Sequence, residues 1–113
     1  MNMKQWVADV LASEKKKALP VLSFPSIQKM EITVAELIND SDKQVEGMKI
    51  IADSFPTAAS VSLMDLSLEA EAFGSKIRVS DDEVPTVIGS IVSTEEEAEA
   101  LKVPEIGAGR TQI

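Results

Sequence analysis

Hydrophobic residues recur at helical spacing in two parts of the first half of the chain. Near the start they predict an amphipathic helix, whose apolar positions are Met3, Trp6, Val7, Val10 and Leu11. The lysines at 15–17 close this segment, where cations complement the dipole of a helix end. A second stripe predicts a longer helix that stops before Pro56, and its apolar face consists of Val45, Met48, Ile51, Ala52 and Phe55.

Two capping-box patterns indicate where helices begin. Thr33-Val-Ala-Glu36 predicts the start of a short helix that ends at Asn39 and Asp40. The second pattern, at 41–44 (Ser-Asp-Lys-Gln), predicts the start of the longer helix that carries the second apolar stripe.

Two continuous apolar runs, at 19–24 and 58–64, predict buried strands. Because a helix stands between them in the sequence, we expect a right-handed crossover and a parallel pair. The second run ends at Asp65, and the pattern of 66–73 predicts a helical turn with Gly74 as its C-cap. The chain is therefore assigned to the α/β class.

The second half of the chain is less regular. Residues 76–80 alternate like an exposed strand and are followed by a turn signal at Asp81-Asp82. The segment 84–92 contains Pro85 and Gly89, so we expect it to be irregular or short-stranded. Ser93 and Thr94 precede a predicted short helix over 95–101. The Gly-Ala-Gly at 107–109 is only faintly similar to a phosphate loop, because no strand precedes it and no Walker lysine follows.

Composition restricts the partners and the chemistry. The chain has 113 residues, the size of one small domain, and its net charge of −8 comes from acids spread along it, which argues against nucleic acid or a membrane surface as partner. It contains no cysteine and no histidine, so thiolate and Ser-His catalysis and any Cys/His zinc site are excluded within it. The start lacks the apolar core of a secretory signal, and we expect a cytoplasmic protein.

The strongest candidate for chemistry is Asp65, because the carboxyl ends of buried strands open onto the ligand crevice of α/β proteins. The same residue could instead cap the following helical turn by accepting backbone N–H groups. The consecutive acids at 81–83 cannot all face one cation without a tight loop, so we expect a solvated turn there and no metal site in the chain.

Four segments together resemble the N-terminal third of the uroporphyrinogen decarboxylase family. They are 19–22 (Leu-Pro-Val-Leu), 64–74 (Met-Asp-Leu-Ser-Leu-Glu-Ala-Glu-Ala-Phe-Gly), 77–79 (Ile-Arg-Val) and 103–110 (Val-Pro-Glu-Ile-Gly-Ala-Gly-Arg). The resemblance implies a TIM (β/α)8 barrel, with residues 1–113 as the N-terminal segment of an incomplete barrel domain. Its superfamily also contains the methylcobamide:coenzyme M methyltransferases.

The resemblance also implies site residues. Asp65 matches the aspartate with which the decarboxylases hold the pyrrole N–H groups of their tetrapyrrole, which makes it the candidate catalytic residue. The loop after the first predicted strand would form another wall of the pocket and bind substrate through Ser23, Phe24, Ser26 and Gln28. Pro25 and Lys29 stand where the decarboxylases carry two arginines for the substrate carboxylates, so the methyltransferase branch is the closer match.

The resulting hypothesis is the N-terminal part of a methyltransferase-like enzyme that moves a methyl group between a methyl-corrinoid and a thiol. Zinc and a corrinoid are implied for the full-length protein and no cofactor for this chain, which we expect to be inactive alone. Its partners would be a small-molecule substrate or a corrinoid protein, and self-association into a homo-oligomer stays open. The alternatives are uroporphyrinogen decarboxylation in porphyrin biosynthesis and a small non-catalytic interaction module that binds through a sheet edge.

Overall fold

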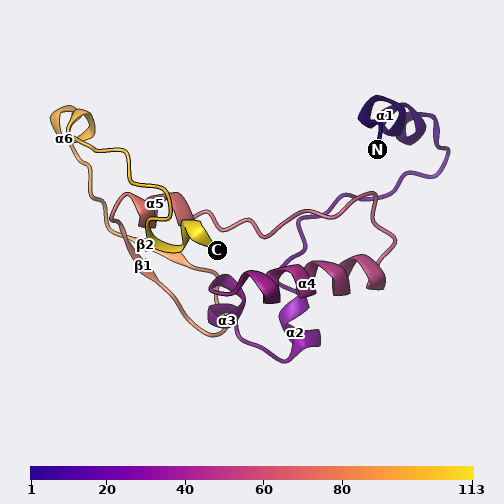
Figure 1. Cartoon of the computed structure of the whole chain (residues 1–113), viewed down its shortest axis with the longest axis horizontal. Helices are drawn as coiled ribbons and strands as arrows, with labels where there is room; N and C mark the ends of the chain where they lie inside the picture. Colours follow the sequence, from indigo (N-terminus) through magenta and orange to yellow (C-terminus); the bar gives the residue numbers. More distant parts are fainter.

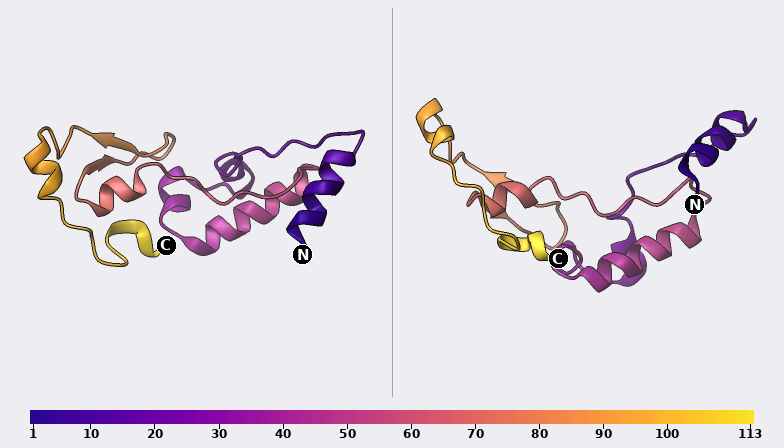
Figure 2. Two further views of the ribbon diagram at one scale, coloured as in Figure 1. Left: turned by 90° about the horizontal axis from the view of Figure 1, so that it is seen from above. Right: turned by 45° about the horizontal axis from the view of Figure 1, so that its top comes forward.

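Short helices make up most of the regular structure in this computed structural model, which describes residues 1–113 (Figure 1). In chain order the elements are α1 (Met3–Ala12), α2 (Ser26–Met30), α3 (Val34–Ile38), α4 (Ser41–Ser54), α5 (Leu68–Ala72), β1 (Lys76–Arg78), β2 (Thr86–Ile88), α6 (Glu95–Glu99) and the 3-10 helix η1 (Gly109–Gln112). Helices α2 and α3 contact α4, and α5 contacts η1. Helices α1 and α6 lie at opposite ends of the molecule (Figures 1 and 2).

Helix α1 forms where the apolar spacing predicts it. Asn2 caps its start, since the side-chain oxygen accepts hydrogen bonds from two backbone N–H groups of the first turn at 3.1 and 3.2 Å. At the other end Lys16 Nζ donates to the carbonyl oxygens of Val10 and Leu11, at 3.1 and 2.7 Å. The lysines lie beyond the helix end at Ala12 and not in its last turn as predicted, and among them Lys16 binds the final carbonyl groups. No residue of α1 is buried, and on its apolar face Trp6 and Val10 are half-buried while Met3, Val7 and Leu11 are exposed.

Capping boxes were predicted at the starts of α3 and α4, and the structure contains the first of them but not the second. Thr33 and Glu36 form the predicted capping box at the start of α3. Helix α4 instead takes Asp40 as its N-cap, and the Asp40 carboxylate accepts the N–H groups two and three residues later at 3.0 and 3.1 Å. The predicted capping box at Ser41 is therefore wrong by one residue, because the preceding carboxylate satisfies those amides first. The helix ends at Ser54, before Pro56 as expected.

The buried core lies where α2, α3 and α4 meet. It contains only four buried hydrophobic side chains, which are Val34, Leu37, Ile38 and Ile51. Helix α2 approaches α4 at Gly47, which is also buried. A Cβ at that position would lie 2.5 Å from Ser26 Oγ, so the close approach of the two helices depends on the missing side chain.

The two predicted parallel strands are not formed, and this prediction is wrong. Residues 19–24 and 58–64 form no strand, with a bend at Ser23, a turn at Phe24 and bends at 58 and 59. A single backbone hydrogen bond, from Ala58 N to Ala18 O at 2.8 Å, links the stretches that contain them. An apolar run indicates that a segment can be buried. A β-strand also needs a ladder of backbone hydrogen bonds to a neighbouring strand, and an apolar run does not predict that ladder. The helices and the small sheet are consistent with part of an α/β domain, and the TIM barrel itself stays a prediction.

The one sheet is a small antiparallel pair in the second half of the chain. Strand β1 lies within the predicted exposed strand, and β2 lies in the segment expected to be short-stranded. Their register pairs Lys76 with Ile88, Ile77 with Val87 and Arg78 with Thr86. Helix α6 begins after Thr94 as predicted, with a capping box formed by Thr94 and Glu97, and it ends at Glu99, two residues before the predicted end at 101.

The molecule leaves much of its surface uncovered. Its accessible area is 8329 Å², whereas a compact monomer of this mass exposes about 6,100 Å². The radius of gyration is 17.9 Å, against about 13 Å for a compact domain of this length. Figure 2 shows the thin, drawn-out shape from two further directions. No helix has both the length and the apolar character required to cross a bilayer.

Candidate functional site

Asp65 lies in a nearly enclosed ionic cluster formed by three parts of the chain. The cluster consists of Asp65, Ser67 and Glu71 around α5, and Arg110 on η1; we call it the Arg110 cluster. The side chains of Asp65 and Arg110 are only 6% and 9% exposed. Ionised groups with so little access to water need direct partners, and each of these two is the other's counter-ion.

The Asp65 carboxylate uses its two oxygens differently. Oδ1 accepts hydrogen bonds from the backbone N–H and the hydroxyl of Ser67, at 2.9 and 2.6 Å. Oδ2 accepts one from Arg110 Nη1 at 2.5 Å. The capping alternative is thus partly right, because Oδ1 shapes the turn that leads into α5, although Ser67 is the N-cap residue itself. Oδ2 is the oxygen that this local turn does not use.

The C-terminal end of helix α5 positions Glu71, the second carboxylate of the Arg110 cluster. Gly74 has a φ of +95°, and its N–H and that of Ser75 donate to the carbonyl oxygens of Glu71 and Ala70, both at 2.9 Å. This pair of bonds is the Schellman arrangement, which requires a left-handed residue directly after the helix. The prediction that Gly74 closes this helix is confirmed.

Arg110 binds a different partner through each of its three guanidinium nitrogens. Nε donates to Glu71 Oε2 at 2.7 Å, Nη1 to Asp65, and Nη2 to Ser67 Oγ at 3.0 Å. The turn that carries it contains Gly109 with a φ of +57°, where a Cβ would lie 3.3 Å from Glu71 Cγ. Glycine therefore allows η1 to approach α5 closely enough for the guanidinium to reach all three partners.

These contacts keep both charges in place at neutral pH. Burial raises the pKa of Asp65, but the hydrogen bonds from Ser67 and the Arg110 guanidinium outweigh it and hold that pKa below its usual range. Burial lowers the pKa of Arg110, and the two carboxylates more than reverse this. Asp65 is thus a fixed anion, suited to accepting hydrogen bonds from a ligand and unsuited to donating a proton.

A small hollow adjoins the cluster. Its volume is about 90 Å³, and Asp65 and Arg110 are the charged residues of a wall that also includes Ile38, Gln44, Leu63, Leu68 and Ile113. The C-terminal end of the chain lies beside α3 here (Figures 1 and 2). The hollow has room for a ligand's hydrogen-bonding group, and a whole tetrapyrrole or corrinoid would not fit within it.

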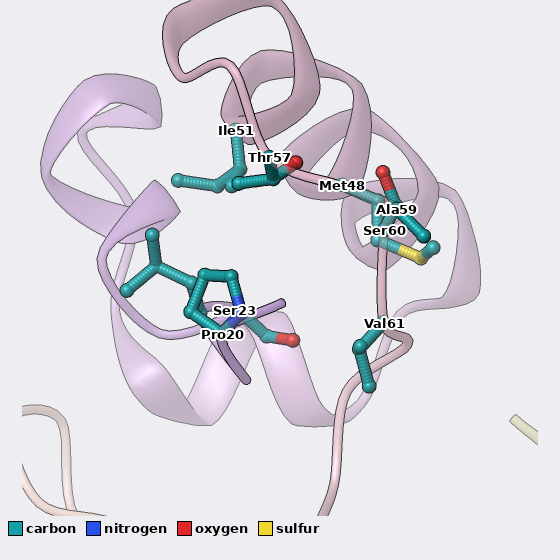
Figure 3. Close-up of a pocket in the computed structure, with 9 residues that line it drawn as sticks. Pro20, Ser23, Met48, Ile51, Thr57, Ala59, Ser60 and Val61 are labelled. Carbon is teal, nitrogen blue, oxygen red and sulfur yellow. The ribbon is translucent and has the colours of Figure 1, made fainter. Parts of the chain in front are cut away.

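The four predicted loop residues do not join Asp65 in this hollow. Ser23 lines a separate one with a volume of about 10 Å³, enough for about one water molecule. Figure 3 shows Ser23 and Pro20 across from Ile51 and Thr57. Ser26 is buried against α4 and donates to the Ser23 carbonyl at 2.7 Å, Phe24 is half-buried, and Gln28 is exposed. The structure therefore places Asp65 and Ser23 in two different hollows.

The other charged groups that the sequence analysis considered lie away from the Arg110 cluster. Asp82 accepts the Ser80 hydroxyl at 2.7 Å, and Glu83 pairs with Arg78 at 3.4 Å in the exposed turn. No three carboxylates in the structure are grouped to hold a metal ion. The residues of this chain therefore do not fit the zinc that the resemblance implies for the full-length protein.

Sequence reasoning singled out Asp65 and missed its partners. Arg110 ends the segment 103–110, directly after Gly107-Ala-Gly109, and the sequence pattern predicted no role for it. The usable signal was its rarity, since the chain has two arginines and one of them follows two glycines in a tight turn. What could not be read from the sequence was the pairing of positions 45 residues apart.

Comparison with known proteins supports the assignment of a family. A model of the uroporphyrinogen decarboxylase (URO-D) family matches residues 6–113, which is nearly the whole chain. No curated protein matches the chain, and no solved structure does.

Proposed function

Because the chain belongs to the uroporphyrinogen decarboxylase (URO-D) family, we propose that it supplies the N-terminal part of a cytoplasmic enzyme that transfers a methyl group between a methyl-corrinoid and a thiol. The observation that carries the proposal is the Asp65 carboxylate, which is ionised, nearly enclosed and adjacent to a hollow. Such a group anchors N–H donors of a ligand without taking part in proton transfer.

Methyl transfer is preferred to decarboxylation because of the loop before α2. A substrate with many carboxylates requires bidentate cationic partners, which arginine provides and lysine does not. Pro25 ends this loop as the N-cap of α2, and the exposed Lys29 lies within α2 itself. The periphery of a corrinoid carries neutral amides, whose N–H groups suit an anionic acceptor such as Asp65.

The large solvent-accessible surface of the chain supports the proposal that it is part of a larger protein or assembly. The molecule exposes 8329 Å², about 2,200 Å² more than a compact monomer of its mass. Large apolar side chains are among the exposed ones, and Leu66, Val103 and Ile106 are 83%, 86% and 107% exposed. Apolar surface on this scale is normally covered by further polypeptide. A small independent interaction module is the second candidate.

Thiol activation has to come from outside these residues. The thiolate is the reactive form of a thiol, and the chain has neither cysteine nor histidine to hold a metal that would stabilise it. Within the proposal, the residues of this chain bind and orient a substrate, and we expect no turnover by the 113 residues alone.

The test compares this chain with the intact gene product in two assays. One follows demethylation of methylcobalamin by a thiol from the change in the visible spectrum, and the other follows decarboxylation of uroporphyrinogen. We expect methyl transfer by the intact product only, a strong loss with Asp65→Asn, and near wild-type rates with the exposed-turn control Asp82→Asn. Turnover by the short chain, or decarboxylation without methyl transfer, would contradict the proposal.

A further inference from the structure

The geometry of the Arg110 cluster limits how many hydrogen bonds Asp65 can still accept. A carboxylate has about four acceptor positions, two on each oxygen. Ser67 fills both positions of Oδ1, and Arg110 fills one of the two on Oδ2. One acceptor position, on Oδ2, is left for a ligand.

Arg110 is positioned to hold that oxygen in place. Its guanidinium is planar and rigid, and its other two nitrogens are tied to Glu71 and Ser67 on or beside α5. The Asp65 carboxylate is therefore fixed at Oδ1 by Ser67 and at Oδ2 by Arg110, and Ser67 also bonds to Arg110. Rotation of the carboxylate would break bonds at both oxygens.

We propose that Arg110 is the positioning residue for Asp65, and that it restricts this carboxylate to a single N–H or O–H donor of the ligand, accepted at Oδ2. The inference rests on the proposed function and deepens it, since it selects the class of ligand group. A peripheral amide of a corrinoid offers single donors. The several converging pyrrole N–H groups of a porphyrinogen outnumber a single acceptor position.

The chain contains its own control for this inference. It has two arginines, and Arg78 forms an ion pair with Glu83 in which both side chains are more than 60% exposed. The charged groups in contact with the Arg110 guanidinium are Asp65 and Glu71, one from the segment before α5 and one from α5 itself. Substituting each arginine in turn therefore compares an enclosed pair with an exposed pair.

The first measurement needs no ligand. In the full chain labelled with ¹⁵N-arginine, we expect one slowly exchanging Nε–H signal that Arg110→Lys removes, and one fast signal that Arg78→Lys removes. The ¹³C titration of the Asp65 carboxyl should move to higher pH in Arg110→Gln, move less in Arg110→Lys, and stay unchanged in Arg78→Gln. Equal exchange of the two arginines in the wild type would overturn the inference even if no variant folds.

The second measurement concerns the ligand class and uses the intact gene product with methylcobalamin and, without oxygen, with uroporphyrinogen as probes. We expect Arg110→Lys to weaken methylcobalamin binding at least several-fold and Arg78→Lys to leave it unchanged. Slow Arg110 exchange together with no methylcobalamin binding would reject the proposed function and leave the positioning role standing. Tighter binding of uroporphyrinogen than of methylcobalamin to the wild type would overturn the single-donor restriction.

Discussion

The Cβ that an alanine would add at Gly47 lies 2.5 Å from Ser26 Oγ and 3.1 Å from Ser26 Cβ. Helix α2 crosses α4 at this point, and the Ser26 hydroxyl is already committed to the Ser23 carbonyl. The crossing places α2 and the loop before it, where the resemblance suggested a substrate-binding wall. The position of that loop relative to α4 thus depends on Gly47, in the middle of α4.

Gly47→Ala should destabilise the fold. Alanine is favoured over glycine by about 1 kcal/mol in a helix interior, but overpacking against the Ser26 side chain costs about 1–3 kcal/mol. We expect a net loss of up to about 2 kcal/mol in urea unfolding, and recovery in the Ser26→Gly, Gly47→Ala double variant. Glu46→Ala, on the exposed side of α4, should stay within about 0.5 kcal/mol of wild type. A stabilised Gly47→Ala single variant would contradict the close crossing.

Removing Arg110 should cost far more than removing Arg78. Breaking a buried pair by deleting one partner costs about 3 kcal/mol, since an unpaired charge is left behind. An exposed pair contributes about 0–1 kcal/mol. We therefore expect Arg110→Gln to lower the free energy of unfolding by about 3 kcal/mol and Arg78→Gln to have little effect, both measured by urea denaturation. Equal losses for the two variants would show that the Arg110 cluster is open to water.

The low pKa of Asp65 predicts a specific loss of stability in acid. Burial opposes this low pKa, and the bonds from Ser67 and Arg110 produce it. A carboxyl whose folded pKa is depressed stabilises the fold above its unfolded pKa of about 3.9, and this contribution is lost as the pH falls through the folded pKa. Urea unfolding between pH 2 and 7 should show a constant contribution above about pH 5 and a decline below about pH 4.

Asp65→Asn should remove part of that acid decline and lower stability at pH 7. Glu36 also has a lowered pKa, mainly through the backbone N–H of Thr33 and the nearby Lys43. Its side chain is exposed to solvent, so Glu36→Gln should leave the acid decline close to that of wild type. An unchanged acid decline in Asp65→Asn would mean that this carboxyl is not held by Arg110.

The two capping boxes should differ in their effect on global stability. Helix α3 carries most of the buried core, so Thr33→Ala should cost about 1 kcal/mol in the free energy of unfolding. Helix α6 buries no residue, and Thr94→Ala should stay within about 0.5 kcal/mol in the same measurement. Amide hydrogen exchange at Glu97 should nevertheless speed up in Thr94→Ala, since its N–H loses the threonine acceptor.

The open surface should be visible in solution. Small-angle scattering of the chain should give a radius of gyration near 17.9 Å if it is monomeric, and a hydrophobic dye should bind strongly. Leu66→Lys and Val103→Lys, both at highly exposed apolar positions, should reduce dye binding without loss of helix content. A compact, dye-free monomer with a radius near 13 Å would favour the small interaction module.

Local signals in the sequence determined most of the helices. Apolar spacing, capping residues and Pro56 predicted α1, α3, α4 and α6, because these signals act between residues within one or two turns of each other. Gly74 predicted the end of α5 for the same reason, since a left-handed residue is needed directly after the helix. The error at Ser41 was also local, a choice between two adjacent caps.

The sequence alone also excluded Cys/His chemistry and directed attention to Asp65. Only the tertiary structure decided what surrounds that carboxylate. Arg110 reaches it across 45 residues, and the two apolar runs stayed unpaired. Both outcomes depend on which segments far apart in the sequence come into contact. The spacing of residue types along the chain does not specify these long-range contacts.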